Sequence, residues 1–440
     1  MLVGSAIAGL DGDITFTADE VDLVNAGVTK KIAGTGNLVF RNQFLGAGVQ
    51  IGGDEGQAGS TGVLSISDAD LAALAIGFAS ITAGRSEGGT GVLTSYLESW
   101  GSDLQLYADT GIVFNSDSDS LDVSGILSAS VLAGSLSLAD TLGVVAEVID
   151  LRAASDVVVN GSLTSDRGSD GIIRLTAGLG ASRIGSVVIA GVLEALGSSS
   201  DLRADAGTLG GNIILTATGT VSVDDQISVN AASGTVSNLG TSVWTANAFD
   251  ISAGQNTVVE TAVNLLSGRM FGTASLQLSN DGAFAITNFV GAGGDLSFEG
   301  TGVNATITIT SIDSGSGDLT LNSSGSVLGV VGGFGQTLGM VRADTLNVES
   351  GFSISLLSEV ARANLSTTGS GSIFLSEEDA LVLDLTIFDG AAQVTAGGLF
   401  DVESAVSLTD RNENDLSFNT TTAVWLICGW VGSMRGPWGM

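Results

Sequence analysis

Histidine is absent from this chain of 440 residues, and cysteine and proline occur once each. Without histidine the chain lacks the base of Ser-His-Asp and Cys-His nucleophile systems, and it lacks every histidine ligand for a metal. The single cysteine, Cys428, cannot form an internal disulfide, and a chain of this length can bury a large core without one. No convergent set of acid, base and cation is visible, so we expect the chain not to be an enzyme.

Positive charge is scarce. Lys and Arg total 14 against 47 Asp and Glu, which gives a formal net charge of −33. Since contacts with phosphates require a basic surface, this balance argues against nucleic acid as a partner. The acidity also disfavours unassisted binding to anionic lipid. Because 44% of the residues are hydrophobic and only 14% are charged, we expect a folded chain rather than a disordered one.

Long hydrophobic runs are missing as well. No stretch of 18 or more apolar residues is present, so no transmembrane helix and no membrane insertion are expected. The first ten residues carry no side chain with positive charge, and Asp11 and Asp13 follow at once, which argues against a signal peptide. If the protein is exported, we expect its targeting and anchoring segments to lie outside this chain, as in a fragment of a longer protein.

What the chain does contain is one repeated pattern. A small or acidic residue precedes a short alternation of apolar and polar residues, and a turn of Gly, Ala, Ser or Asn follows. Alternation with a period of two predicts short β-strands joined by tight turns. Clear examples are Asp103–Leu106, Gly211–Leu215, Val221–Val223, Asp295–Phe298 and Asp318–Leu321. Helical character is confined to residues 67–74, where Ser67 is a candidate N-cap.

Equivalent patterns recur at intervals of roughly 20–30 residues, as from Asp295 to Asp318. This spacing predicts an all-β fold, a right-handed parallel β-helix (β-solenoid) with roughly 20–30 residues per coil. Small turn residues and scarce proline fit coils that exchange backbone hydrogen bonds at about 4.8 Å, and Asn and Thr beside the strands are expected to stack in ladders. Tandem Ig-like sandwiches are the alternative. The side chains expected to fill the lumen are Leu104, Leu106, Ile213, Leu215, Val221, Val223, Leu319 and Leu321.

The chain divides into a repeat region, residues 1–419, and an atypical tail, residues 420–440. The tail contains three of the five Trp residues, the only Pro and the only Cys, and it does not continue the alternation. It is either a cap that covers an exposed coil edge or an unrelated extension. The remaining tryptophans, Trp100 and Trp244, are isolated, and we expect them to be core or loop anchors.

Two stretches resemble the repeats of filamentous haemagglutinin-like proteins, which are large bacterial surface adhesins. They are Gly210–Ser233, and Ile51–Gly56 with Gly62–Leu71 and Ile81–Gly84. The resemblance covers most of residues 45 to 420. It implies a right-handed parallel β-helix on an exported protein, extracellular or at the surface of a bacterium with an outer membrane. It also implies an outer-membrane secretion partner. The secretion domain of that family is not recognisable in residues 1 to 50.

Clusters of acidic residues are the candidate metal sites. Calcium takes six to eight oxygen ligands, which acidic turns on a rigid coil can supply. Gly291–Phe298 is also a partial match to the calcium-binding β-roll repeat. Solvated turns that keep the protein soluble are the alternative explanation for the clusters. The calcium candidates are Asp117, Asp119, Asp224, Asp225 and Asp295, and no other cofactor is expected.

These observations favour a structural and adhesive function over catalysis. We expect a segment that projects a β-helical rod for adhesion to a host or neighbouring cell surface, a glycan or a matrix. One alternative is a carbohydrate-active β-helix, for which Asp224 and Asp225 are the only adjacent pair of aspartates in a strong strand context. Adjacent strand residues point to opposite faces, which weighs against a shared role in one cleft. The other alternative is a calcium-stabilised component of an extracellular matrix.

Overall fold

The computed structural model describes most of the chain, in nine segments. They are residues 7–23, 32–54, 63–75, 77–97, 99–115, 120–166, 170–330, 339–409 and 415–420. Within these segments the chain forms 42 strands and one short helix, and the strand pairs that define the sheets are parallel. The chain divides into two compact units, Met1–Ser242 and Val243–Met440, called here the first and second unit. The expected all-β parallel solenoid is confirmed, and an array of antiparallel sandwiches is excluded.

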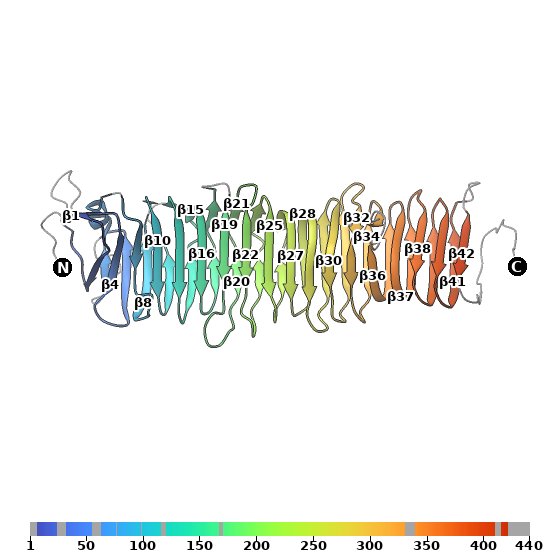
Figure 1. Cartoon of the computed structure of the whole chain (residues 1–440), viewed down its shortest axis with the longest axis horizontal. Helices are drawn as coiled ribbons and strands as arrows, with labels where there is room; N and C mark the ends of the chain where they lie inside the picture. The colour runs from blue at the N-terminus through green and yellow to red at the C-terminus, as the bar shows by residue number, and fades with distance from the viewer. Residues whose placement is uncertain are drawn as a thin grey trace. The chain divides into compact units, whose positions relative to one another are not determined.

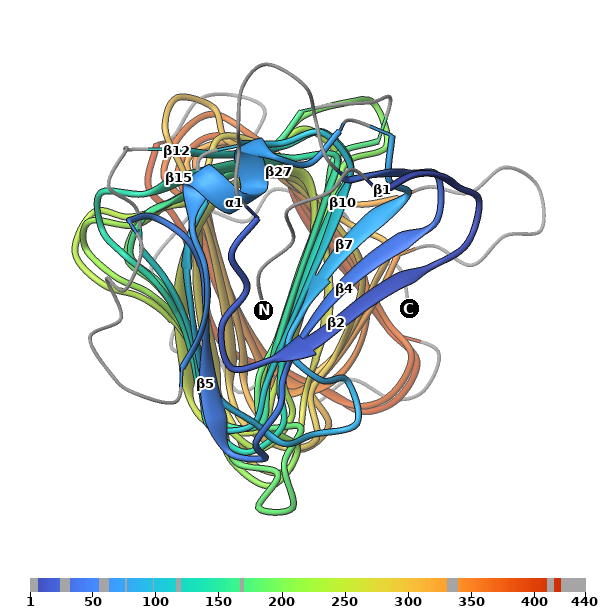
Figure 2. The same cartoon turned by 90° about the vertical axis from the view of Figure 1, so that its left-hand side faces the viewer.

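In the first unit each regular coil contributes one strand to each of three sheets, which form three sides around the lumen (Figure 2). Sheet 1 contains β2 (Ile14–Ala18), β4 (Asn37–Asn42), β7 (Ser80–Ala83), β10 (Asp103–Ala108), β13 (Ile126–Val131), β16 (Val148–Ala153), β19 (Ile172–Thr176), β22 (Asp201–Asp205) and β25 (Gln226–Ala231). Sheet 2 contains β6 (Leu64–Ile66), β5 (Ala47–Gly52), β8 (Thr90–Tyr96), β11 (Gly111–Phe114), β14 (Ser135–Leu138), β17 (Val157–Val159), β20 (Val187–Ile189), β23 (Ile213–Leu215) and β26 (Val236–Asn238). Sheet 3 contains β9 (Ser99–Trp100), β12 (Ser120–Val123), β15 (Gly143–Ala146), β18 (Ser162–Ser165), β21 (Val192–Ala195) and β24 (Thr220–Val223).

The coil length follows from the strand register in sheet 1. From Leu104 to Ile227, residues that occupy the same position in neighbouring coils are 22 to 29 residues apart, which agrees with the spacing expected from the sequence. Strands β10, β16 and β22 of sheet 1 accordingly follow one another along the first unit, with β13 and β19 between them (Figure 1). The series is Leu104, Leu127, Ile149, Ile173, Leu202 and Ile227.

Alternate side chains of every regular strand point into the lumen and fill it. All eight side chains predicted to lie there are no more than 2% exposed. Full burial of one Leu, Ile or Val stabilises the fold by about 1.5–3 kcal/mol, so the stacked columns of these residues form the core. Trp244 belongs to the core of the second unit, where its ring lies 5.9 Å from that of Phe249, and its prediction as a core residue is confirmed.

The N-terminal part of the first unit departs from regular winding. Strand β6 follows β5 in sequence. It pairs with the edge of β5 that lies towards the N-terminal residues, where Glu20 forms a bridge with β6. Helix α1 (Asp68–Ala72) comes next and confirms the helix expected at residues 67–74. Ser67 caps it: its hydroxyl accepts the Asp70 N–H, and the Asp70 carboxylate accepts the Ser67 N–H at 2.9 Å. The remaining short strands, β1 (Ile7–Leu10) and β3 (Ile32–Gly34), pair with each other.

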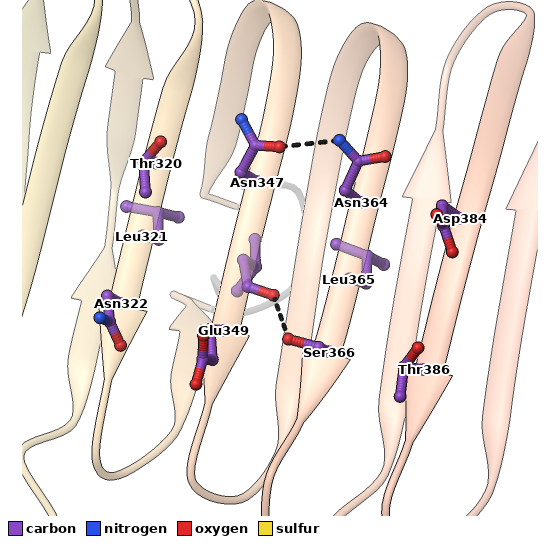
Figure 3. Close-up of a pocket in the computed structure, with 11 residues that line it drawn as sticks. Thr320, Leu321, Asn322, Asn347, Glu349, Asn364, Leu365, Ser366, Asp384 and Thr386 are labelled. Carbon is purple, nitrogen blue, oxygen red and sulfur yellow. Dashed lines mark hydrogen bonds between the residues drawn. The ribbon is translucent and has the colours of Figure 1, made fainter. Parts of the chain in front are cut away.

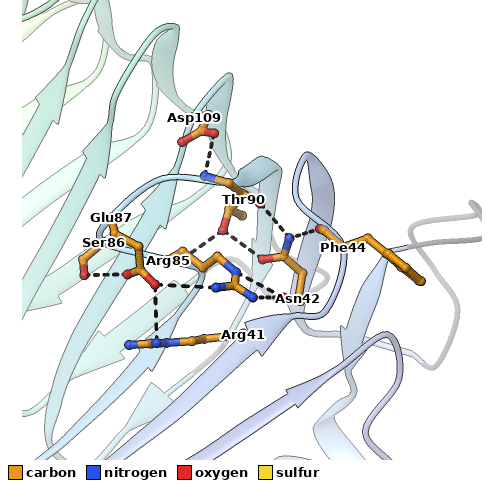
Figure 4. Close-up of polar contacts among 9 residues, drawn as sticks. Arg41, Asn42, Phe44, Arg85, Ser86, Glu87, Thr90 and Asp109 are labelled. Atoms are coloured by element: carbon orange, nitrogen blue, oxygen red, sulfur yellow. Dashed lines mark hydrogen bonds and ion pairs between the residues drawn. The ribbon is translucent and has the colours of Figure 1, made fainter.

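A buried asparagine holds together two stacked turns near this end (Figure 4). The Asn42 side chain is fully buried at the end of β4, where its amide nitrogen donates to Gly89 O at 2.8 Å and its oxygen accepts from the Thr90 hydroxyl at 3.0 Å. Arg85 donates to Asn42 O at 2.8 Å and pairs with Glu87. A buried amide is stable only when such partners are present, so these turns are locked together.

The second unit is wound from coils of 17 to 27 residues, measured between stacked positions from Leu276 to Val402. Its longest strands, β28 and β37, bend so that one strand pairs with two strands of the next coil. The strands are β27 (Trp244–Ala253), β28 (Thr257–Met270), β29 (Leu276–Asp281), β30 (Phe284–Val290), β31 (Leu296–Thr301), β32 (Ile307–Ile309), β33 (Ser311–Asp313), β34 (Leu319–Ser323), β35 (Val327–Gly329), β36 (Met340–Ser350), β37 (Ile354–Thr367), β38 (Ile373–Glu377), β39 (Leu381–Ile387), β40 (Ala392–Ala396), β41 (Phe400–Ser407) and β42 (Leu416–Thr420).

Short polar side chains connect neighbouring coils at the starts of the strands. In each of three series, called here the polar ladders, a side-chain oxygen accepts the backbone N–H of the equivalent residue one coil further on, at 2.8–3.4 Å. One ladder lies in the first unit and two lie in the second. Their members are Ser135, Asp156, Ser186, Asn212 and Thr235; Asn256, Ser275, Asp295 and Asp318; and Thr306, Ser326, Ser353 and Ser372.

The ladders explain why a small or acidic residue precedes so many strands in the sequence. A backbone N–H at a strand start needs an acceptor when it is taken out of water, and Ser, Thr, Asn and Asp supply one from the preceding coil. Ladders that join side chain to side chain, as expected from the sequence, occur at other positions. Asn364 donates to Asn347 at 2.7 Å and Asn264 to Asn247 at 3.2 Å.

We expect Asp156→Ala to lower the free energy of unfolding by about 1–2 kcal/mol, because the N–H of Ser186 loses its acceptor. Asp156→Asn keeps an acceptor oxygen and is expected to recover most of that loss. Asp140→Ala, at an exposed turn, is the matched control and is expected to stay within about 0.5 kcal/mol of wild type. Urea melts measure all three, and equal effects of Asp156→Ala and Asp140→Ala would contradict a ladder role.

One carboxylate of the second unit lies inside the fold. Glu377, at the end of β38, is 3% exposed and accepts hydrogen bonds from the Ser358 hydroxyl at 2.6 Å and from the N–H groups of Val360 and Asp379. Burial raises the pKa of the Glu377 carboxyl above its ordinary value, because the loss of water outweighs these hydrogen bonds.

This raised pKa makes the stability of the second unit depend on pH. The native state holds the Glu377 proton more tightly than the unfolded chain, so the free energy of unfolding should fall as the pH rises from about 4.5. Glu377→Gln removes that titration. Urea melts between pH 4.5 and 7 should therefore show stability shifting in favour of the variant as the pH rises. The exposed Glu378→Gln is the control, and identical pH slopes for wild type and Glu377→Gln would refute the account.

Candidate binding surface

The outward face of four neighbouring strands in the second unit, β34, β36, β37 and β39, forms a shallow groove of about 320 Å³ (Figure 3). The strands are parallel and in register, so side chains of alternate residues line up in rows across them. The groove is lined mainly by hydroxyl, amide and carboxylate groups. Its lining residues are Thr320, Leu321, Asn322, Asn347, Val348, Glu349, Asn364, Leu365, Ser366, Asp384 and Thr386.

Two rows make up the polar part of this groove. The first runs through Thr320, Asn347, Asn364 and Asp384, and the second runs two residues further along each strand. The apolar residues between the rows are buried in the lumen, and this alternation places the polar ones outside. The hydrogen bond from Asn364 to Asn347 fixes the amide planes of the first row across two strands (Figure 3). The second row is Asn322, Glu349, Ser366 and Thr386.

The two carboxylates of the groove, Glu349 and Asp384, lie on strands separated by β37 and two positions apart along the register. Strand spacing and rise place their backbones about 12 Å apart. The two acids therefore lie in different rows of the groove, Asp384 in the first and Glu349 in the second.

Arginines of the second unit that lie near the groove are already paired with acids. Arg362 forms a two-pronged contact with Glu403, at 2.7 and 2.9 Å, and Arg342 lies 2.6 Å from Glu359. The hydrogen bond from Arg362 holds the pKa of Glu403 below its usual range. The arginine charges are thus balanced locally, and the groove keeps an acidic and neutral polar character.

Three of the calcium candidates, Asp224, Asp225 and Asp295, lie in described segments, and each has a hydrogen bond of its own. Asp224 accepts the Gly197 N–H at 3.0 Å, the Asp225 N–H donates to the Ser200 hydroxyl at 3.1 Å, and Asp295 is a member of a polar ladder. Within the nine described segments no three acidic side chains lie close enough together to hold a metal ion. Asp117 and Asp119 lie outside these segments, as do residues 421–440 of the tail. Calcium binding by this chain stays a prediction.

Asp225 has one electrostatic neighbour of note, Asp201 at the start of β22. Burial raises the pKa of the Asp201 carboxyl, Arg174 and Arg203 oppose the rise, and the charge of Asp225 adds to it. The charge of Asp225 thus acts on a second acid, Asp201, and two arginines of sheet 1 oppose its effect there.

Comparison with known proteins gave no relatives. No protein-family model matches the chain, and no curated protein and no solved structure matches it either. Among the helices of the described segments, none is long and apolar enough to cross a membrane. The assignment of a β-solenoid fold therefore rests only on the strand pairing described above. The likeness to filamentous haemagglutinin-like repeats stays a prediction from the sequence.

Proposed function

We propose that this chain is a non-enzymatic, structural and adhesive segment of a large exported bacterial protein, extracellular or held at the cell surface. The observation that carries the proposal is how the fold uses its polar groups. Acidic side chains such as Asp156 and Asp295 accept backbone hydrogen bonds between coils, and others pair with arginine, as Asp150 does with Arg152. The outward face of β34, β36, β37 and β39 carries two rows of polar side chains suited to contact with a partner.

The physical logic of a β-solenoid supports such a role. Each added coil extends the structure by about 4.8 Å and repeats the outward faces of the coil before it, so binding groups can be displayed at fixed spacing. The acidity of the chain keeps such surfaces soluble and mutually repulsive. A glycan, a matrix polymer or a protein on a host or neighbouring cell is the partner that this arrangement suits, and an outer-membrane secretion partner would export it.

A carbohydrate-active β-helix is the second candidate, and the groove with Glu349 and Asp384 is the observation in its favour. We expect no new ends when the chain is incubated with a panel of neutral and acidic polysaccharides, because the chain has no histidine and Arg362, the arginine that acts on Asp384, is already paired with Glu403. Reducing-end release would be measured for wild type, Glu349→Gln and Asp384→Asn. Release that either substitution abolishes would replace the adhesive proposal with the enzymatic one.

Adhesion is tested with the folded chain coupled to fluorescent beads. We expect these beads to be retained on at least one class of glycan, matrix or cell surface, and the same chain denatured before coupling should not be retained. An acidic globular protein of unrelated fold controls for charge. Retention no better than this control on every surface would refute the adhesive role.

A further inference from the structure

A shallow pocket, called here the Phe374 pocket, lies on the outward face of β35, β37, β38 and β40 in the second unit. Its volume is about 230 Å³, which suits a ligand the size of a single ring. The strands are parallel and in register, so their outward side chains line up in rows. One row through the pocket is Ser355, Phe374 and Gln393, and the next is Leu357, Ser376 and Thr395.

An aromatic ring is the main apolar group of this pocket. Ile373 and Leu375, the neighbours of Phe374 in β38, are buried in the lumen, and the alternation of the strand therefore points Phe374 outward. Phe374 is 48% exposed. A ligand that covers the ring removes it from water, which is favourable by about 25 cal/mol for each Å² of apolar surface.

Uncharged hydrogen-bonding groups flank the ring. Ser355 lies beside it on β37, Gln393 lies beside it on β40, and Ser376 lies two residues further along β38. Within the described part of the chain the side chains of these three residues have no hydrogen-bond partner, so they can bond to a ligand. None of the described residues that line the pocket is charged.

These groups restrict the chemistry of a ligand. An apolar side chain of a partner protein would cover Phe374, but it would take the Gln393 amide and the serine hydroxyls out of water without giving them a partner. A charged ligand would find no opposite charge in the lining of the pocket. A neutral ring that is apolar on its face and carries hydroxyls around its rim meets both requirements.

We propose that the Phe374 pocket binds one sugar ring of a neutral polysaccharide. The C–H face of a pyranose packs on the Phe374 ring, and its hydroxyls exchange hydrogen bonds with Gln393 and the flanking serines. Because the pocket is shallow, the polysaccharide can continue past it on both sides of the bound ring. Glu378, two residues beyond Ser376, and the net charge of −33 disfavour acidic sugars. This inference deepens the adhesive proposal and rests on it for the source of the polysaccharide.

Ligand-observed NMR with the full chain tests the pocket, because it detects the weak binding, about millimolar, that one sugar ring provides. The probes are glucose, galactose, mannose and N-acetylglucosamine, the linear oligomers of each, and the acidic sugars glucuronate and galacturonate. At least one neutral sugar should show saturation transfer. Its oligomers should bind at least as tightly, and the acidic sugars should bind more weakly.

Substitutions on the outward face locate the binding. Phe374→Ala removes the ring and should weaken binding about tenfold, whereas Phe374→Tyr keeps an aromatic face and should bind as wild type does. Gln393→Ala removes the amide and should weaken binding about three- to tenfold. Phe44→Ala, at an exposed aromatic of the first unit, is the matched control and should bind as wild type does. Circular dichroism checks that each variant is folded, and Gln393→Ala keeps the test valid if Phe374→Ala is not.

Several results would overturn the assignment: wild type that binds no neutral sugar, acidic sugars or free monosaccharides preferred over neutral oligomers, or a folded Phe374→Ala with unchanged affinity. Binding of N-acetylphenylalanine amide in place of any sugar would overturn it as well, because it would identify a contact for a protein side chain. The bead experiment separates the two proposals. Beads retained without sugar binding leave adhesion standing and remove the sugar site, and sugar binding without retention does the reverse.

Discussion

Backbone hydrogen bonding between coils is the constraint on which the rest of this structure depends. Each coil of a parallel β-solenoid must offer its N–H and C=O groups to the coil before and the coil after it, at about 4.8 Å. Paired strand residues therefore sit above residues one coil earlier, and their side chains stack in columns. Most columns in the lumen consist of Leu, Ile, Val, Ala and Phe, and the strand starts carry short side chains that can bond to a neighbouring backbone N–H.

The unusual composition follows from this constraint. Proline would remove a donor from the ladder of backbone hydrogen bonds, and it occurs once in 440 residues. Glycine is frequent where backbones of adjacent coils approach closely. At Gly134 an added Cβ would overlap the backbone oxygen of Thr110, which no side chain tolerates. The acidity has a structural part as well, because aspartates serve as acceptors in the polar ladders, where a backbone N–H and not another carboxylate is their nearest partner.

The alternation of apolar and polar residues was enough to predict which side chains fill the lumen: Leu104, Ile213 and Leu319 were predicted to lie there and do. Ser67 was predicted from a separate local signal to cap a helix, and it does. The partners of the strand-start acids were missed, because each acceptor and its donor are one whole coil apart and the coil length varies. A pocket lined by Leu74, Phe78 and Trp100 was missed for a related reason: it arises where sheet 3 begins beside α1, which no local pattern encodes. Once the strand register is known, the polar rows of the groove can be recognised in the sequence as alternating Thr, Asn, Asp and Glu residues.

The central claim is that the chain is a scaffold of stacked coils that displays its outward faces outside a cell. Labelling of intact cells that naturally produce the chain, with an antibody raised against the folded protein, tests it most directly. The account predicts strong labelling of intact cells or of the secreted fraction, with little gain when the cells are permeabilised. Labelling that requires permeabilisation, with none in the secreted fraction, would contradict it.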